Sequence, residues 1–268
     1  MRIARFAAGD EVSYGLVGTA RAGGAAGGGK VIAELAGHPF GGGSDGIRLT
    51  GTTYSLTDVR LLAPVLPSKV IGFAPAGPGP AGRADDGLDD DSVMYLKPST
   101  AVCGPSDAIR YPAQANRLGA DGKLAVIIGR LCRQVPPDQA AAVIFGYSCA
   151  LDVTAADAAA RDGQWARAKG FDTFCPLGPW IETDAVAGDA TLVTSVNGQE
   201  RRHASIPQAA QGVAALVAAA SSVMTLLPGD VLLAGEAGDA VDELARGDEV
   251  SVSIDGVGTL TNKVEKGD

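Results

Sequence analysis

Lysine and aspartate side chains stand beside two apolar runs in the middle of the chain, and together they could carry out acid–base chemistry. Asp121 and Lys123 immediately precede the apolar run Leu124–Ile128, Asp152 closes the next apolar run, and Lys169 follows in a polar segment. Residues i and i+2 of a β-strand face the same side, so Asp121 and Lys123 are expected to project together. A lysine ammonium shielded from water beside carboxylates can act as an acid, an electrophile or a Schiff-base former.

Carboxylates, rather than histidines, are the candidate general bases. The chain contains two histidines: His38 lies in the N-terminal part, and His203 follows two arginines in a segment expected to form a polar turn. We therefore expect no histidine base. The candidate bases are Asp121 and Asp152 beside the two strands, together with Glu236, a position that a family resemblance described below singles out.

Short apolar strands separated by turns must position these side chains. Strands are expected at 1–6, 12–17, 31–35, 70–73, 93–96, 124–128, 145–153, 192–196, 231–233, 249–254 and 258–260. Helices are expected at 138–143, 155–167 and, as an amphipathic helix on the core, 208–227. Because strands dominate without a βαβ repeat, we predict an α+β, mostly β fold. Residues 1–66 are predicted to form a small N-terminal β domain and residues 67–268 the main domain, with an irregular loop rich in Pro, Gly and Asp at 74–91.

Composition excludes several classes of partner. The 268 residues carry a net charge of −9 and no basic cluster, which argues against binding to nucleic acid or to an anionic membrane. No apolar run reaches the roughly 18–20 residues that a membrane helix needs. The four cysteines show no metal-binding spacing, so free buried thiols in a reducing cytoplasm are expected.

Several segments match one known family. The run Arg167–Trp180 (Arg-Ala-Lys-Gly-Phe-Asp-Thr-Phe-Cys-Pro-Leu-Gly-Pro-Trp) is the most specific of them, and matches also cover 1–6, 96–98, 224–230 and 256–262. By these residues the chain resembles the fumarylacetoacetate hydrolase family. The resemblance implies a mixed β-roll with a small N-terminal β domain, and it implies a homodimer.

The metal site that the resemblance implies is altered here. Family hydrolases hold a divalent cation through a Glu-x-Glu pair at the start of one strand and an Asp at the end of the next, and such oxygen ligands suit Mg²⁺ or Ca²⁺. The matching positions are Asp121, Lys123 and Asp152. Since a protonated lysine cannot ligate, we expect an internal ion pair or triad in place of the metal, with Asp121 and Asp152 as its remnants, and no cofactor.

Other functional positions of the family are replaced as well. Ala156 and Ala159 stand where relatives have the Arg and Gln that polarise the substrate carbonyl, and Pro78 stands about where the histidine of a His–Glu dyad is expected. Glu236 replaces a threonine that binds the substrate carboxylate, so charge repulsion would reject that carboxylate unless a cation lies close.

Some family positions are retained. Lys169 matches the lysine near the metal in relatives, and Lys97 matches a further family lysine, for which a strand lysine extending to the surface is an equal alternative. The candidate substrate-binding residues are Gln164, Arg167, Phe73 and Tyr147.

Two functional hypotheses from different classes follow. The first is a metal-independent enzyme in which lysines and carboxylates act on a small enolisable 1,3-dicarbonyl substrate by cyclisation, decarboxylation, dehydration or isomerisation, with bacterial specialised metabolism as a setting. The second is a catalytically inactive relative that serves as a binding or scaffold partner. Metal-dependent hydrolysis of a C–C bond in an acylpyruvate-like substrate is third, because a ligand, the dyad histidine and the carbonyl donors are missing.

Overall fold

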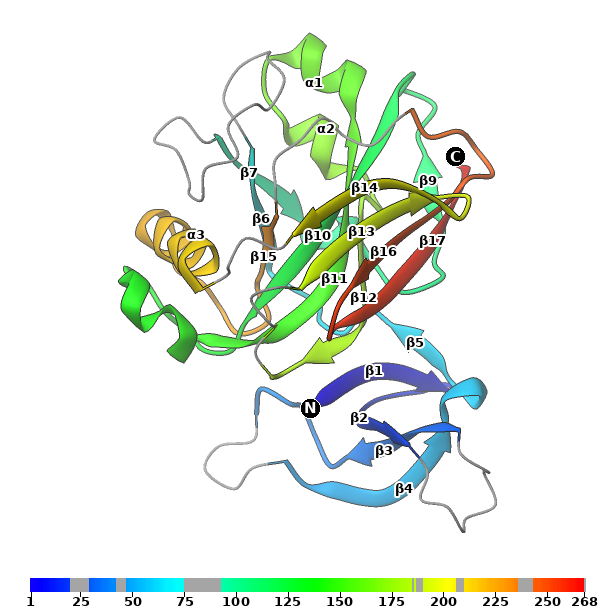
Figure 1. Ribbon diagram of the computed structural model, residues 1–268, viewed down its shortest axis with the longest axis vertical. Helices are drawn as coiled ribbons and strands as arrows, with labels where there is room; N and C mark the ends of the chain where they lie inside the picture. Colours follow the sequence, from blue (N-terminus) through cyan, green and yellow to red (C-terminus); the bar gives the residue numbers. More distant parts are fainter. Residues whose placement is uncertain are drawn as a thin grey trace.

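A computed structural model describes residues 1–19, 29–41, 47–74, 93–184, 186, 190–205, 210–235 and 243–267. Within them, two sheets form the body of the molecule (Figure 1). The larger sheet has the strand order β4-β3-β2-β1-β12-β11-β10-β15-β6-β7, with β5 added beside β1 and β8 beside β12, and the smaller has the order β14-β13-β16-β17-β9. Parallel pairs such as β15 with β6 occur among antiparallel ones, so both sheets are mixed. The predicted α+β, mostly β roll is confirmed.

The elements have the following bounds. The larger sheet contains β1 (Arg2–Ala8), β2 (Glu11–Thr19), β3 (Lys30–Leu35), β4 (Leu49–Ser55), β5 (Arg60–Leu62), β6 (Lys69–Ala74), β7 (Val93–Pro98), β8 (Val102–Cys103), β10 (Leu118–Ile128), β11 (Ile144–Ala155), β12 (Cys175–Glu182) and β15 (Val231–Ala234). The smaller sheet contains β9 (Ile109–Tyr111), β13 (Thr191–Val196), β14 (Gln199–Ser205), β16 (Glu249–Ile254) and β17 (Gly258–Lys266). The α-helices are α1 (Ala156–Asp162), α2 (Ala166–Gly170) and α3 (Ala210–Val223), and 3₁₀ helices lie at Leu56–Asp58, Ser99–Ala101 and Pro137–Ala142.

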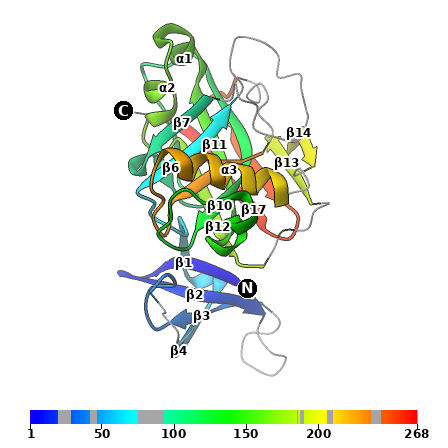
Figure 2. The same cartoon turned by 90° about the vertical axis from the view of Figure 1, so that its left-hand side faces the viewer.

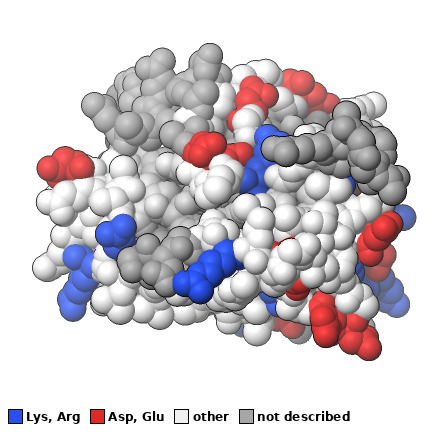
Figure 3. Space-filling view, turned by 90° about the horizontal axis from the view of Figure 1, so that it is seen from below, with Lys and Arg blue, Asp and Glu red and all other residues white. Residues whose placement is uncertain are grey.

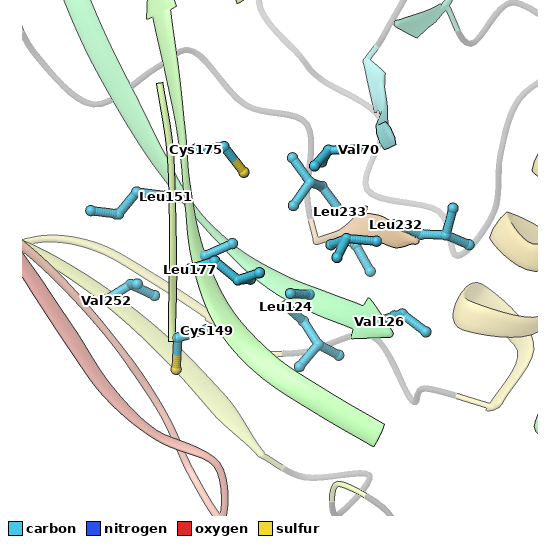
Figure 4. Close-up of a cluster of buried hydrophobic side chains, with 14 of the residues drawn as sticks. Val70, Leu124, Val126, Cys149, Leu151, Cys175, Leu177, Leu232, Leu233 and Val252 are labelled. Atoms are coloured by element: carbon cyan, nitrogen blue, oxygen red, sulfur yellow. The ribbon is translucent and has the colours of Figure 1, made fainter. Parts of the chain in front are cut away.

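The antiparallel pair β10 and β11 lies at the centre of the core. Every residue of β10 is buried, and the two strands pair along their length from Leu118 opposite Ala155. This pairing explains why β10 begins six residues before the apolar run that predicted it. The smaller sheet packs closely on one face of the pair: a Cβ at Gly122 would overlap Thr194 Oγ1 and lie 2.8 Å from Val252 Cγ2. Figure 4 shows the apolar side chains that fill this region.

The N-terminal strands form a visible unit at the bottom of Figure 1. They enclose a small apolar cluster that includes Phe6, Ile32 and Trp180, while β1 also continues the larger sheet by pairing with β12, with Ile3 opposite Ile181. The chain crosses from β5 to β6 between 63 and 68, but the sheet is continuous, so the division into domains 1–66 and 67–268 stays a prediction. On the face seen from below in Figure 3, the described basic and acidic side chains are interspersed among uncharged surface.

Several local expectations need correction. The helix expected over 155–167 is two short helices, because Gly163, in the left-handed region at φ 65°, ends α1 and turns the chain. The polar turn expected around His203 is strand β14, paired with β13 through His203 opposite Val193. The long helix expected over 208–227 is α3, which ends at Val223 and contacts β15. Figure 2 shows α3 lying across the near side of the main part of the molecule. Residues 75–91 of the predicted loop lie outside the described residues.

No helix in the described ranges is long and apolar enough to cross a membrane. The four cysteines, which were expected to be free and buried, are free: Cys103, Cys149 and Cys175 are buried and Cys132 is half-buried. Burial raises the pKa of the Cys175 thiol to about 12, so this cysteine is a neutral, inert part of the core.

Candidate functional site

Asp152 is the centre of a buried cluster of polar side chains. The residue lies on β11 and is 3% exposed. Its Oδ2 accepts a hydrogen bond from the Tyr95 hydroxyl and another, of 2.6 Å, from Lys169 Nζ, while Lys97 Nζ lies 2.8 Å from Oδ1. Burial would raise the pKa of Asp152, but the Lys169 and Lys97 ammoniums outweigh burial and hold the pKa well below its usual value. Asp152 is therefore a buried anion at neutral pH.

Lys97 forms hydrogen bonds to three backbone positions and an ion pair with this carboxylate. It is fully buried, and its Nζ donates to the backbone carbonyls of Val153, Phe174 and Lys169 at 2.8, 2.9 and 3.2 Å. These bonds use the three ammonium protons, so the contact with Asp152 Oδ1 is an ion pair without a well-aligned hydrogen bond. Burial lowers the pKa of Lys97, and Asp152 partly restores it. Of the two expectations for Lys97, a surface-seeking lysine is excluded by its burial.

Asp121 faces Asp152 across the β10–β11 ladder. The two residues are directly opposite in register, which places their Cβ atoms roughly 4.5–5.5 Å apart. Asp121 Oδ1 accepts a 3.0 Å hydrogen bond from Arg202 on β14, and Lys123 Nζ lies 3.5 Å from Oδ2. Burial raises the pKa of Asp121, with the cations of Lys123 and Arg202 acting in the opposite direction. The two facing aspartates thus have pKa values shifted in opposite directions.

Two aromatic rings border the Lys169 ammonium. Lys169 Nζ lies 4.4 Å from the centre of the Tyr95 ring and 5.8 Å from that of Trp165, and the two rings are 5.5 Å apart. Trp165 and Lys169 are four residues apart at the start and near the end of α2, so they share a face of this helix. The turn at Gly163 directs α2 back over β11, which brings Lys169 to Asp152.

The structure brings together four of the candidate catalytic residues. Asp121, Lys123, Asp152 and Lys169 are all at most 8% exposed and lie within the ion-paired cluster. Glu236 lies outside the described residues, although a Cβ placed on the preceding Gly235 would lie 3.5 Å from Lys123 Cδ. The chain therefore passes beside Lys123 immediately before Glu236.

The candidate substrate-binding residues lie elsewhere. Gln164 is exposed, and its Oε1 accepts a 2.8 Å hydrogen bond from the Ala166 backbone amide. Arg167 is exposed and pairs with Asp162 over 2.9 Å. These contacts support the local turn and the start of α2.

Phe73 and Tyr147 lie on the wrong faces of their strands to join the cluster. Gly72 and Tyr95 are paired on β6 and β7, so the neighbouring Phe73 faces away from the side on which Tyr95 reaches Asp152. Tyr147 is five residues before Asp152 on β11, about 17 Å along the strand and on the opposite face. Both pack against the apolar core.

Sequence reasoning missed Tyr95, Trp165 and Arg202. Tyr95 and Lys97 are alternate residues of β7 and point to one carboxylate, so the i, i+2 spacing from Lys97 was a usable signal. Trp165 and Arg202 gave no comparable signal, because their places depend on the turn before α2 and on how the smaller sheet curves over β10.

A divalent cation held by three carboxylates, which the resemblance implies, does not fit these residues. The second ligand position is occupied by the Lys123 ammonium, which lies 3.5 Å from Asp121 Oδ2. Both oxygens of Asp152 already face lysine ammoniums, and one also accepts the Tyr95 hydroxyl. Across the described ranges, no three His, Cys, Asp or Glu side chains are grouped so that they could hold a metal ion.

Comparisons with known proteins agree with this architecture. The family model for the fumarylacetoacetate (FAA) hydrolase C-terminal domain matches residues 79–265, and the Rv2993c-like N-terminal model matches residues 1–64. Protein Rv2993c of Mycobacterium tuberculosis is 44% identical over 234 residues, which cover 86% of each chain. The oxaloacetate tautomerase YcgM of Escherichia coli is 35% identical over 184 residues, 66% of this chain and 83% of that protein.

A solved structure extends the similarity to nearly the whole chain. The 5-carboxymethyl-2-hydroxymuconate delta-isomerase from Mycobacterium smegmatis is 43% identical, superimposes with a TM-score of 0.86, and covers 99% of this chain and 100% of its own. Isomerases and tautomerases are therefore among the proteins most similar to this one. The chain belongs to the fumarylacetoacetate hydrolase family.

Proposed function

We propose that the protein is a metal-independent isomerase of the tautomerase type, acting on a small, enolisable 1,3-dicarbonyl acid. The single observation that carries the proposal is the pair of facing aspartates whose pKa values are shifted in opposite directions beside lysine ammoniums. Titratable groups whose environments separate their pKa values are typical of acid–base sites. The similarity to an oxaloacetate tautomerase and a muconate isomerase supports the same reaction class.

Asp121 is the better candidate for the base. A raised pKa makes its carboxylate more basic than an ordinary aspartate, and base strength near the working pH favours proton transfer. Its Oδ1 accepts the Arg202 hydrogen bond, whereas Oδ2 has Lys123 at 3.5 Å, beyond hydrogen-bond distance. Asp152 is a poorer base because its carboxylate is surrounded by Tyr95, Lys97 and Lys169.

The proposed reaction moves one proton within the substrate. Asp121 removes a proton from the carbon between the two carbonyls, and the electron pair of the broken C–H bond moves to a carbonyl oxygen. The Lys169 ammonium, fixed by Asp152, stabilises the negative charge that develops on this oxygen. Transfer of the proton from Asp121 to the oxygen, or back to another carbon, completes the isomerisation and restores the carboxylate.

The inactive binding partner is the second candidate, and the closed ion pairing favours it. Asp152 Oδ2 accepts a 2.6 Å hydrogen bond from Lys169, and Oδ1 forms a 2.8 Å ion pair with Lys97, as in a purely structural cluster. Cyclisation, decarboxylation or dehydration of the same substrate class, a homodimer and a cytoplasmic location stay predictions.

Ultraviolet absorbance of the enol tests the proposal, with oxaloacetate and a short acylpyruvate as probes. The protein is first dialysed against EDTA, and ketonisation is then followed with and without added Mg²⁺. We expect the protein to accelerate ketonisation equally with and without Mg²⁺. In Asp121→Asn the rate of ketonisation should fall about 10²–10⁴-fold, the usual contribution of a general base. Lys263→Met, at an exposed lysine on β17, is the control for lysine substitutions and should match the wild type, whereas Lys169→Met should be slow.

Other outcomes discriminate between the candidates. Ketonisation that is accelerated only with Mg²⁺ would contradict metal independence and would favour the metal-dependent chemistry of the family. Tight binding of the probes without acceleration would support the binding-partner hypothesis.

A further inference from the structure

Tyr95 contacts both members of the Asp152–Lys169 ion pair. Its hydroxyl donates a hydrogen bond to Asp152 Oδ2, the oxygen that also accepts a hydrogen bond from Lys169 Nζ. The centre of its ring lies 4.4 Å from Lys169 Nζ. A cation over an aromatic face in a water-poor site is attracted to the ring. The residue is 6% exposed, and burial followed by the nearby Asp152 raises its pKa well above the usual value, so the phenol keeps its proton.

The ring reaches this position because residue 72 has no side chain. Gly72 is the register partner of Tyr95 on β6, and a Cβ added there would overlap Cζ and the hydroxyl of Tyr95. The ring therefore lies across the backbone of Gly72 on its way to β11. Any larger residue at position 72 would force the phenol away from Asp152.

We propose that Tyr95 is a positioning residue for the Lys169 ammonium, and that Gly72 is the residue that makes room for it. Without the hydroxyl, Asp152 loses a donor. Without the ring, the Lys169 ammonium loses the aromatic face that restricts its side-chain conformations. The expected effect on catalysis rests on the proposed function, in which the Lys169 ammonium contacts the substrate oxygen.

Three substitutions distinguish the contribution of the Tyr95 hydroxyl, that of the Tyr95 ring and that of the space left at Gly72. Tyr95→Phe keeps the ring and removes the hydroxyl, Tyr95→Leu removes both, and Gly72→Ala displaces the ring. We expect kcat to fall about tenfold in Tyr95→Phe and about a hundredfold in the other two, in line with the loss of one and then two contacts to a charged group, while KM changes less than threefold. The control is Gly18→Ala on β2, where an added Cβ meets no atom within 4 Å, and its kcat should be unchanged.

A double-substitution cycle tests whether Gly72 acts through Tyr95. Adding Gly72→Ala to the Tyr95→Leu protein should cost nothing further in kcat, because the overlapping ring is already gone. Equal costs of Gly72→Ala in the two backgrounds would contradict the coupling and overturn the role given to Gly72.

Proton NMR of the Lys169 ε-methylene gives a readout that does not depend on activity. Ring currents of Tyr95 should shift this resonance upfield in the wild type and in Tyr95→Phe, and the shift should diminish in Tyr95→Leu and Gly72→Ala; Lys169→Arg assigns the signal. An unchanged resonance in Tyr95→Leu would overturn the positioning role even in an active enzyme. A shifted resonance in a protein without isomerase activity would leave the positioning intact and reject only the proposed function.

Discussion

Replacing Lys123 by glutamate should convert the ion-paired cluster into a metal site. In the wild type, Lys123 Nζ lies 3.5 Å from Asp121 Oδ2, an attraction of about 5 kcal/mol at an effective dielectric constant of 20. A carboxylate at this buried position would repel Asp121 and Asp152 instead. Leaving a buried charge without its partner costs about 3–5 kcal/mol, so the metal-free Lys123→Glu protein should be markedly less stable than the wild type.

A divalent cation should recover much of this loss. Three carboxylates would then converge from paired strands, two from alternate residues of β10 and one from the opposite position on β11. Ligand at a hundred times its dissociation constant stabilises a folded protein by about 2.7 kcal/mol. For a chain of this size that corresponds to a rise of about 5–10 °C in Tm.

Thermal unfolding with and without Mn²⁺ measures the effect directly, and isothermal titration gives the stoichiometry. Lys123→Gln is the matched control, because it removes the ammonium without adding a ligand and should show no Mn²⁺-dependent rise. A rise of 5 °C or more in the wild type would refute the reasoning, since it would mean that Lys123 does not exclude the metal. A folded Lys123→Glu protein that ignores Mn²⁺ would refute the prediction, because the two lysines and the tyrosine that contact Asp152 would then be enough to exclude the metal.

Three further predictions concern the same cluster. Asp121→Asn should abolish the acid limb of the activity profile; in the wild type, kcat/KM should fall as pH drops through a pKa above the usual 3.8 of an aspartate, measured by initial rates across pH. Asp152→Asn should lower the free energy of unfolding by about 3–5 kcal/mol at pH 7 in urea titrations, because it leaves two buried ammoniums without their anion. Since folding lowers the pKa of Asp152, its stabilisation is fully present above the unfolded value of about 3.9 and is lost progressively as pH falls from there through the lower folded pKa, so the stabilities of wild type and Asp152→Asn should converge over that range. Lys97→Met should cost a similar 3–5 kcal/mol at pH 7, because three buried carbonyls and Asp152 lose their shared cation, and a smaller loss would show that other groups satisfy them.

The sequence by itself determined the strands and the local direction of their side chains. Apolar runs predicted β10 and β11, and the alternation within a strand placed Asp121 and Lys123 on one side. The lysine at position 123 was enough to predict an ammonium at a position where the family has a carboxylate metal ligand. These features depend on near neighbours along the chain, which is why periodicity and residue type reveal them.

Only the tertiary structure decided which distant residues complete the site. Tyr95 reaches Asp152 across 57 residues of sequence, and Arg202 reaches Asp121 across 81. Their places follow from strand order, from the register of β6 with β7 and from the space left at Gly72. The same long-range geometry directs Gln164, Arg167, Phe73 and Tyr147 away from the cluster, because their orientation is set by a turn or by the face of a strand rather than by chemical type.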